Sequence, residues 1–428
     1  MNKYNSKTFE LPNVDSFVRK ALHWADSFSD FHYFNHCDYE GYLFGTFPKM
    51  LSIGSNRKIV YNHNCFPNLE SFKQENPHQW LIGHLAYDLK NEIEELESNN
   101  EEIIPFSSLA FYIPEHLFFF DEDRVEIHSH QDPTLVFRHI NEVNTHNNLT
   151  QGDALKPIPD VSEKDYLANI KNIGQQIEEG DFYEINYCMS WTERNISINP
   201  ISTFLKLNDI SPMPFSVLQK NSNHYAICAS PERFLKKEGQ KLISQPIKGT
   251  IKKANDPNEN FKQKLKLAGS EKEQAENLMI VDLVRNDLAR SSNSGSVKVE
   301  ELFGIYEFKT INQMISSVSS ELKENISAVE ALKRAFPMGS MTGAPKIEVM
   351  KNIEKYESFK RGLFSGSIGF FKPDGDFDFN VVIRTIFYDK KSKLVNFKVG
   401  SAITYDSVPE KEYEECLLKI ESLSKALS

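Results

Sequence analysis

Cysteine is scarce in this sequence and is not arranged for cross-linking. The 428 residues contain five cysteines, and none of them stands in a CxxC pair. Neither a disulfide framework nor a cysteine-based zinc site is therefore expected. The set consists of Cys37, Cys65, Cys188, Cys228 and Cys416. An odd number of scattered cysteines is typical of a protein kept in a reducing, cytoplasmic environment.

Long apolar runs and basic stripes are also missing. No stretch of about 18 apolar residues occurs, and residues 1–7 are polar with no signal-peptide core; secretion and membrane spanning are not expected. The 49 Lys and Arg are interspersed with 60 Asp and Glu, for a net charge of -11. A nucleic-acid partner is therefore not expected. A small anionic substrate remains open, because a few local cations can dominate a cleft.

The chain divides into two regions of different pattern. Residues 1–140 alternate short aromatic-rich apolar runs, such as LFFF at 117–120, with turn-forming and charged stretches, which predicts a strand-rich N-terminal lobe. Residues 141–159 are polar and rich in turn formers, as in a linker. Residues 160–428 are predicted to form a second domain.

The second region mixes helical and strand-like patterns. Ser162 and Asp165 resemble a helix N-cap box, and the apolar stripe that follows ends at Gly180. Longer helices are predicted over residues 260–290 and 409–426, with strand-like segments between them. Because there is no regular βαβ alternation, the pattern predicts an α+β fold with antiparallel sheets.

Two pairs of glutamates have matching helical spacing. Glu273 with Glu276, and Glu412 with Glu415, are three residues apart and so share a helix face. Four carboxylates brought together repel one another unless a cation joins them, and oxygen ligands suit Mg²⁺. The alternative is two solvated helix faces.

One lysine and one glutamate are candidates for catalysis. Lys248, in PIKGT at 246–250, lies between an apolar strand and a glycine turn; it suits a nucleophilic amine if its pKa falls from about 10.4 towards neutrality. The alternative is a lysine on a polar strand edge. Glu232, in SPERF at 230–234, precedes Phe234, and burial there would raise its pKa and make it a general acid. The alternative is an ion pair with Arg233.

These segments resemble motifs of chorismate-using enzymes. ENLMIVDLVRNDL at 276–288, FPMGSMTGAPK at 336–346 and WLIGHLAYD at 80–88 extend the resemblance over most of the chain. It implies antiparallel β-sheets packed as a sandwich with helices outside. It also implies that residues 1–140 are similar to the N-terminal lobe of anthranilate synthase component I, and that residues 160–428 form a chorismate-binding domain.

The resemblance also implies roles for individual residues. Glu276 and Glu415 match the positions that hold Mg²⁺, with Glu273 and Glu412 acting through water. Arg384 matches an arginine that binds a substrate carboxylate. The remaining matched substrate positions are Thr250, Gly400, Ala402, Lys419, Phe364 and Glu184.

Two of these positions depart from the usual pattern of the family. Many relatives have tyrosine where Phe364 stands. At the position of Glu184, glutamine is the commoner residue in amino-transferring members, and a lysine base is usual in members that activate water. Glutamate there argues against isochorismate or salicylate formation.

Lys248 implies the branch of the family that makes 4-amino-4-deoxychorismate from chorismate and ammonia, for 4-aminobenzoate and folate synthesis. The sequence has no nucleophilic-cysteine elbow, so ammonia is expected from a separate glutamine amidotransferase subunit, as in a heterodimer, or from free ammonium. The alternatives are an anthranilate-forming enzyme, which needs no covalent lysine, an isochorismate- or salicylate-forming enzyme, and a non-catalytic chorismate-binding protein.

Overall fold

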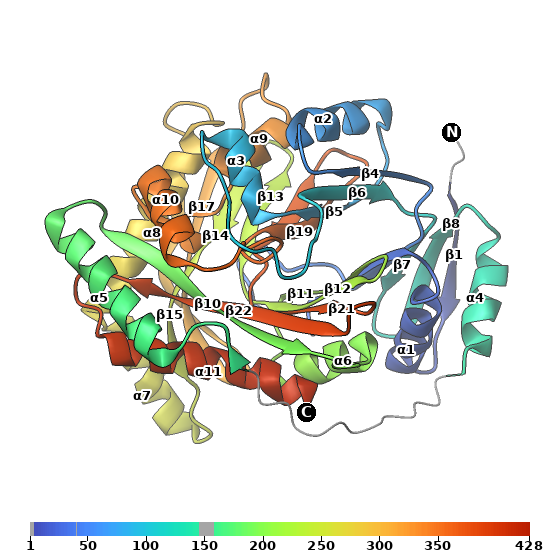
Figure 1. Cartoon of the computed structure of the whole chain (residues 1–428). Helices are drawn as coiled ribbons and strands as arrows, with labels where there is room; N and C mark the ends of the chain where they lie inside the picture. Colours follow the sequence, from blue (N-terminus) through green and yellow to red (C-terminus); the bar gives the residue numbers. More distant parts are fainter. Residues whose placement is uncertain (1–3, 40, 145–157) are drawn as a thin grey trace.

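Apolar strand segments of this chain assemble into two large β-sheets (Figure 1), as seen in a computed structural model that describes residues 4–39, 41–144 and 158–428. The pairings between the named strands run antiparallel. Helices lie around the sheets in Figure 1. The predicted α+β fold with antiparallel sheets is confirmed.

The larger sheet contains strands from both regions of the sequence. Its 12 strands follow the order β1, β8, β7, β3, β2, β11, β12, β21, β22, β10 and β18, with β9 beside β10. Strand β2 pairs with β11, which joins the N-terminal strands to the C-terminal ones. The strands are β1 (Asn5–Glu10), β2 (Asp30–Asn35), β3 (Met50–Ile53), β7 (His116–Phe120), β8 (Arg124–Ser129), β9 (Ile158–Pro159), β10 (Glu184–Arg194), β11 (Phe215–Asn221), β12 (His224–Ser230), β18 (Gly343–Ala344), β21 (Thr385–Asp389) and β22 (Leu394–Ile403).

The smaller sheet is also shared between the two regions. Its 10 strands follow the order β15, β17, β14, β13, β20, β19, β5, β6 and β4, with β16 beside β17. Strand β5 pairs with β19. The strands are β4 (Arg57–Tyr61), β5 (Leu81–Leu85), β6 (Leu109–Ile113), β13 (Arg233–Glu238), β14 (Lys241–Gln245), β15 (Ile247–Lys252), β16 (Lys298–Glu307), β17 (Ile311–Glu321), β19 (Ser367–Phe371) and β20 (Phe377–Asn380).

The two sheets meet through side chains of their central strands. The ring centroids of Phe34 on β2 and Phe370 on β19 are 5.3 Å apart. Between the same sheets, Gln219 Nε2 lies 2.8 Å from His84 Nδ1. Burial of such apolar surface is the main force that holds a two-sheet core together. Strands of residues 1–140 and of residues 160–428 lie in both sheets, so the sheets do not mark a boundary between the two regions. The division into two domains stays a prediction.

Helices cover the outer faces of the sheets. Helices α5 and α11 pack on β22, and α8 packs on β15 and β17. The helices are α1 (Val14–Ala25), α2 (Cys65–Glu75), α3 (Lys90–Ile93), α4 (Pro133–Glu142), α5 (Glu163–Glu179), α6 (Pro200–Ile210), α7 (Pro257–Ala268), α8 (Glu271–Ala289), α9 (Ala328–Ala335), α10 (Lys346–Tyr356) and α11 (Pro409–Leu427), with short 3₁₀ turns η1 (Tyr87–Leu89) and η2 (Gly339–Met341).

Helix α5 begins and ends as the sequence predicts. The Ser162 side chain accepts a hydrogen bond from the backbone N–H of Asp165, which caps a free donor of the first turn. At the other end, Gly180 has a φ of +89°; this left-handed conformation favours glycine and stops the helix.

The predicted helix over residues 260–290 is wrong in its extent, because two helices occupy this region. Helix α7 ends at Ala268, and α8 begins at Glu271. The Ser270 side chain accepts a hydrogen bond from the Glu273 N–H and caps α8. Serine competes for backbone donors in this way, so it starts a new helix here instead of continuing the old one.

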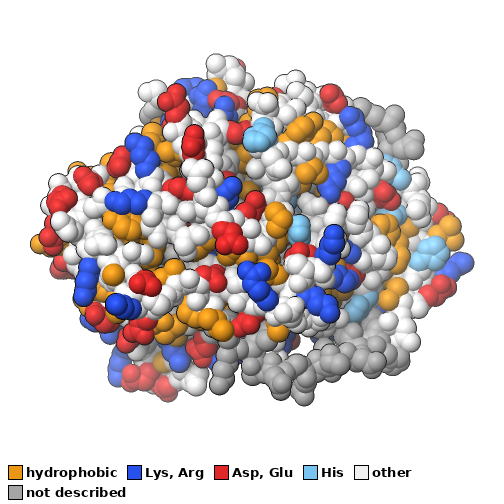
Figure 2. Space-filling model, viewed as in Figure 1, with side chains coloured by type: hydrophobic (Ala, Val, Ile, Leu, Met, Phe, Trp, Pro, Cys, Tyr) orange, Lys and Arg blue, Asp and Glu red, His pale blue; other side chains and the backbone are white. Residues whose placement is uncertain are grey.

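The predicted linker at 141–159 lies largely outside the described residues, because residues 145–157 are not described. On the face seen in Figure 2, positive and negative side chains are interspersed. Within the described ranges, no helix has the length and apolar content needed to cross a bilayer.

A buried arginine ties the larger sheet to the segment before α10. Arg361 Nη2 lies 2.6 Å from Glu357 Oε1 and donates to the backbone oxygen of Asn186 on β10 at 2.7 Å. Its Nη1 donates to the backbone oxygen of Met341 at 2.6 Å. Glu357 Oε1 also accepts a hydrogen bond from the Cys188 N–H at 3.0 Å. Each partner satisfies the other's buried charge, which is the condition for tolerating such a pair.

Replacement of Arg361 by methionine should destabilise the protein strongly. The change leaves Glu357 as an unpaired buried charge, which typically costs about 3–5 kcal/mol. Urea unfolding of the variant measures the loss. As the matched control, Arg285→Met removes an exposed pair with Asp282, and should cost no more than about 1 kcal/mol. Equal losses in the two variants would contradict a structural role for the buried pair.

Candidate active site

One cavity of about 610 Å³ brings most of the predicted site residues together. Residues of β15, β22, α8 and α11 line it. The predicted residues in its wall are Glu232, Lys248, Thr250, Glu273, Glu276, Phe364, Arg384, Gly400, Ala402, Glu412, Glu415 and Lys419. Glu184 is not part of the lining; it lies against Lys248, where the two side chains are 2.7 Å apart.

Lys248 stands at an irregular point of β15. The pairing of β15 with β17 shifts register between Ile247 and Thr250, and Gly249 has a φ of +93° that favours glycine. A Cβ on Gly249 would lie 3.0 Å from Glu273 Oε2, so the glycine also lets α8 approach. The bulge presents Lys248 to the cavity.

The charge state of Lys248 is set by carboxylates. Burial by itself lowers the pKa of Lys248, but Glu184, Glu276 and Glu232 outweigh it and raise that pKa above its usual value. Although β15 is an edge strand, the Lys248 side chain is only 10% exposed, which excludes a solvated lysine on a polar edge. The lowered pKa that the sequence-based role required is not found; the lysine is held as an ammonium ion.

Glu232 has the properties of an acid near neutral pH. Its side chain is buried, and desolvation raises its pKa to about 7 although Ser340 and Lys248 act in the opposite direction. Ser340 Oγ donates to Glu232 Oε1 at 2.6 Å. The alternative partner, Arg233, instead pairs with Asp378 at 2.9 Å.

The four glutamates of helices α8 and α11 face the same cavity. Glu276 and Glu412 are buried, which excludes a fully solvated face for either helix. Burial raises the pKa of Glu276 to about 7, against the opposing effect of Lys248 and Lys272. Lys272 Nζ lies 3.7 Å from both Glu276 Oε1 and Glu412 Oε1, and so joins the two helices.

Glu415 differs from the other three glutamates. Lys419, one turn later on α11, lies 2.6 Å from Glu415 Oε1. The Lys419 charge lowers the pKa of Glu415, with burial acting in the opposite direction. This carboxylate is therefore ionised over the whole neutral range.

The donor chemistry of this group suits a hard divalent cation. All four side chains offer carboxylate oxygens, and Glu276 Oε1 is buried without a hydrogen-bond partner among the described residues. In the described ranges, however, no three His, Cys, Asp or Glu side chains are grouped so that they could hold a metal ion. Magnesium binding therefore stays a prediction.

Arg384 offers an unpaired guanidinium to the cavity. It precedes β21 with a φ of +52°, a left-handed conformation that is costly for a non-glycine residue and is often kept at functional sites. Burial lowers the pKa of Arg384, partly offset by Glu415. No carboxylate oxygen of the described residues lies within 4.0 Å of the Arg384 guanidinium nitrogens, the limit for an ion pair. A planar guanidinium so placed can receive a carboxylate ligand through two parallel hydrogen bonds.

The other predicted substrate positions complete the wall. Lys419 Nζ donates to the Gly400 backbone oxygen at 2.7 Å, and Gln313 Nε2 donates to Thr250 Oγ1 at 3.3 Å. A Cβ on Gly400 would lie 2.5 Å from Cys188 Sγ on the neighbouring strand. Close packing of β22 on β10 thus requires this glycine, whether or not a substrate approaches it. Ala402 and Phe364 also face the cavity.

Three further polar side chains of the cavity wall were not predicted from the sequence. Ser340 lies within the FPMGSMTGAPK motif, but its bond to Glu232 spans 108 residues. Lys272 has no sequence signal beyond its charge. Lys398 lines the cavity, and burial lowers its pKa to about 8 against the effect of several carboxylates. Its Nζ donates to Asn396 Oδ1 at 2.7 Å.

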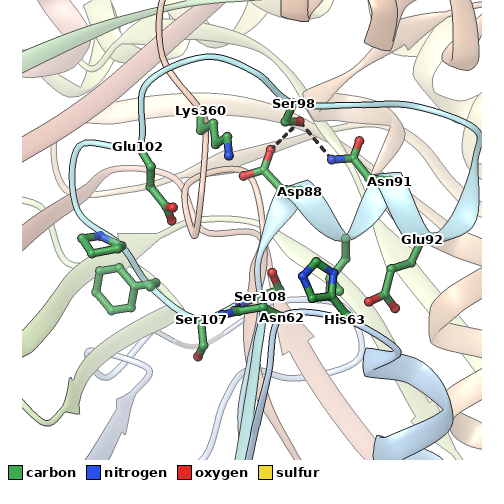
Figure 3. Close-up of a pocket in the computed structure, with 13 residues that line it drawn as sticks. Asn62, His63, Asp88, Asn91, Glu92, Ser98, Glu102, Ser107, Ser108 and Lys360 are labelled. Atoms are coloured by element: carbon green, nitrogen blue, oxygen red, sulfur yellow. Dashed lines mark hydrogen bonds between the residues drawn. The ribbon is translucent and has the colours of Figure 1, made fainter.

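A second cavity of about 570 Å³ lies near η1 and α3. Figure 3 shows Glu102 and Lys360 on one side of it and His63 and Glu92 on the other. Ser98 Oγ donates to Asp88 Oδ1 at 3.1 Å in its wall. None of the predicted site residues lines this cavity.

Comparison with known proteins gives a consistent result. A family model described as chorismate binding enzyme matches residues 33–425. The chain is 39% identical to the chloroplastic aminodeoxychorismate synthase of Arabidopsis thaliana, over 63% of this chain and 30% of that protein. It is 32% identical to aminodeoxychorismate synthase component 1 of Escherichia coli, over 81% of this chain and 76% of that protein.

The fold also matches a solved structure. Anthranilate synthase component I from Streptococcus pneumoniae has a TM-score of 0.77 to this chain at 22% identity, covering 90% of this chain and 94% of that one. At this identity the likeness shows the fold alone. The predicted sandwich of antiparallel sheets with helices outside is confirmed by the structure and by this neighbour.

Replacement of Glu232 by glutamine should flatten the pH dependence of stability. The pKa of Glu232 is about 7 in the folded protein against 4.5 for a free glutamate, so only the folded chain keeps this proton between those values. The free energy of unfolding therefore falls as pH rises through this window. At 1.36 kcal/mol per pKa unit, Glu232 accounts for about 3 kcal/mol of that fall.

Urea unfolding at pH 4.5 and pH 7.5 measures this difference. Glu232→Gln should remove its share of the fall, whereas Glu348→Gln, which removes an exposed carboxylate paired with Lys351, should leave the dependence as in the parent. A parental dependence in Glu232→Gln would show that the raised pKa is not a property of Glu232.

Proposed function

Because this chain belongs to the chorismate binding enzyme family, we propose that it converts chorismate and ammonia to 4-amino-4-deoxychorismate. The observation that carries this proposal is the presence of a lysine amine, Lys248, in one cavity with a protonatable carboxyl, Glu232. An enzyme that lets ammonia attack chorismate directly has no use for such an amine.

Substrate binding follows from the charges of the cavity. Chorismate carries two carboxylates, and the unpaired guanidinium of Arg384 is suited to one of them. The second is assigned to the glutamate side of the cavity, where a bound cation is needed because carboxylates repel one another. Thr250, Gly400, Ala402, Phe364 and Lys419 line the same cavity and would surround the ring between these anchors.

Magnesium is the proposed cation. Glu276 and Glu415 would hold it directly, and Glu273 and Glu412 would act through water molecules. When bound, the ion supplies positive charge for a substrate carboxylate. Lys272 lies between Glu276 and Glu412, and half-exposed as it is, it can move away from them.

The proposed reaction uses two side chains in sequence. The Lys248 amine forms a C–N bond to the ring as the ring hydroxyl departs by allylic displacement. Glu232 gives its proton to that hydroxyl, which leaves as water; a pKa of about 7 keeps much of Glu232 protonated at neutral pH. Ammonia then displaces the lysine and yields 4-amino-4-deoxychorismate.

We propose that a glutamine amidotransferase subunit supplies the ammonia. The bacterial relative is named component 1, which implies another component. The cysteines of this chain are poor candidates for glutaminase chemistry, because burial raises the pKa of each of them, as for Cys37 at about 11. The scattered cysteines also support the proposed cytoplasmic location, and the product supports a role in 4-aminobenzoate and folate synthesis.

Product analysis tests the proposed reaction. Incubation of the chain with chorismate, Mg²⁺ and ammonium at mildly alkaline pH should give 4-amino-4-deoxychorismate, identified by chromatography and mass spectrometry. Lys248→Ala should lose at least roughly 10³-fold in kcat, as expected when a nucleophile is removed. Lys262→Ala, which removes an exposed pair with Glu259, should keep the parental rate.

Other products would redirect the assignment. Anthranilate from the parent chain would move it to the neighbouring branch of the family. A product formed without any nitrogen source would indicate isochorismate or salicylate formation. Chorismate bound but not consumed, with saturating ammonium and magnesium, would indicate a non-catalytic binding protein.

Arg384→Met should weaken chorismate binding more than it slows the chemistry. Loss of hydrogen bonds to a charged carboxylate costs about 1.5–3 kcal/mol, which corresponds to a rise in KM of roughly 10- to 150-fold. Steady-state kinetics over a range of chorismate concentrations separates KM from kcat. Arg384→Lys should keep part of the affinity. The control variant Arg194→Met, at an exposed strand end, should leave KM at the parental value. A parental KM in Arg384→Met would exclude this anchor.

A further inference from the structure

Lys248 and Glu184 form a buried ion pair beside the cavity. Lys248 Nζ lies 2.7 Å from Glu184 Oε1, with the Glu184 side chain 1% exposed. Both Glu184 oxygens are buried, and neither has a hydrogen-bond partner of good geometry among the described residues; the contact with Lys248 is an ion pair. Among the described residues, the proposed nucleophile is the one ion-pair partner of Glu184.

The backbone holds Glu184 in place. Glu184 begins β10 and pairs with Ala344 of β18. A Cβ on Gly343 would lie 2.0 Å from the Glu184 backbone oxygen, so the two backbones are in close contact. The preceding residue, Tyr183, donates its N–H to the Ala344 oxygen at 2.8 Å. The carboxylate thus projects from a rigid strand end towards Lys248, which is the arrangement that precise proton transfer needs.

Other carboxylates face Lys248 from further away. Among the described residues, Glu184 alone lies within the 4.0 Å of an ion pair with Lys248 Nζ. The remaining charged groups that act on this lysine are Glu232 before β13, Glu273 and Glu276 on α8, and Glu415 on α11. Glu184 in turn raises the pKa of Glu276. Direct proton transfer from Lys248 is therefore open to one carboxylate only.

The proposed reaction requires Lys248 to lose a proton. An ammonium ion has no lone pair and cannot form the C–N bond. We propose that Glu184 is the general base that removes a proton from Lys248 and so prepares its amine for attack on chorismate. This inference rests on the proposed function and adds a proton acceptor to it.

The proton balance closes within the site. Transfer from Nζ to Oε1 turns the ion pair into a neutral amine and a neutral carboxylic acid, so that neither group carries a buried charge during the attack. The amine then forms the C–N bond, and Glu232 protonates the leaving hydroxyl. When ammonia displaces the lysine, the amine leaves neutral and takes its proton back from Glu184. The protonated product amine returns a proton to Glu232.

Two measurements on Glu184→Gln test the inference. The first is the rate at which Lys248 reacts with an amine-directed acylating reagent between pH 7 and 10, followed by mass spectrometry of its peptide. Loss of the carboxylate removes a group that stabilises the ammonium ion, so Lys248 should be acylated at least about 10-fold faster at pH 8. This readout needs no turnover and stays valid if the product of the enzyme is a different one.

The second measurement is the pH dependence of kcat for chorismate consumption with ammonium. Although its lysine is more reactive towards the reagent, Glu184→Gln should turn over roughly 10²- to 10⁴-fold more slowly, as for loss of a general base. Its kcat should rise with pH as hydroxide replaces the missing base, while KM for chorismate stays near the parental value. Glu184→Asp should recover part of the rate.

A matched control is Glu307→Gln, at the end of β16 and outside the cavity, which removes ion pairs with Lys253 and with Lys264 of α7. It should leave both readouts unchanged. Faster acylation without slower turnover would mean that Glu184 only holds Lys248, and would overturn the proposal. Unchanged acylation would overturn it as well. If the parent shows no turnover with chorismate, the proposed function fails, and with it the role for which the base is needed.

Discussion

Lys248 is an ammonium group taken out of water and held against Glu184, with other carboxylates nearby. Each charge in this group depends on the rest. Burial pushes the pKa of Glu232 and of Glu276 upward, while Lys248 pulls both downward; in return, carboxylates raise the pKa of Lys248. Because interactions between charges strengthen as water is excluded, removing one member changes the protonation of the others. The protonation states of the charged groups in the cavity are therefore coupled.

The architecture brings these groups together from different sheets. Lys248 comes from the edge of the smaller sheet and Glu184 from the larger one. The buried Arg361 binds backbone oxygens at Asn186 and Met341, and so joins the strand that carries Glu184 to the segment that carries Ser340. Strain at Arg384 and close backbone contact at Gly343 are tolerated because the surrounding sheets overdetermine these positions.

The ends of helix α5 could be predicted from the sequence because they depend on interactions between residues close together in the chain. The cap at Ser162 and the stop at Gly180 depend on neighbours a few residues away, and the structure has both. The break between α7 and α8 was missed, although Ser270 is also a capping residue, because a serine inside a helical pattern does not reveal which backbone donor it will take. For the site, motifs identified many of the residues that line the cavity, including Lys248, Glu232 and Arg384. They did not reveal that Glu184 is the partner of Lys248.

The sequence by itself determined which elements form and which chemical groups are available: the periodicity of apolar residues sets helices and strands, and the motifs place an amine, carboxyls and a guanidinium in one family of enzymes. Only the tertiary structure decided which groups touch. Ser340 reaches Glu232 across 108 residues, and Lys248 meets Glu184 across two different sheets. The protonation state of a titratable group depends on how deeply the group is buried and on its distance to other charges. Spacing along the chain specifies neither quantity.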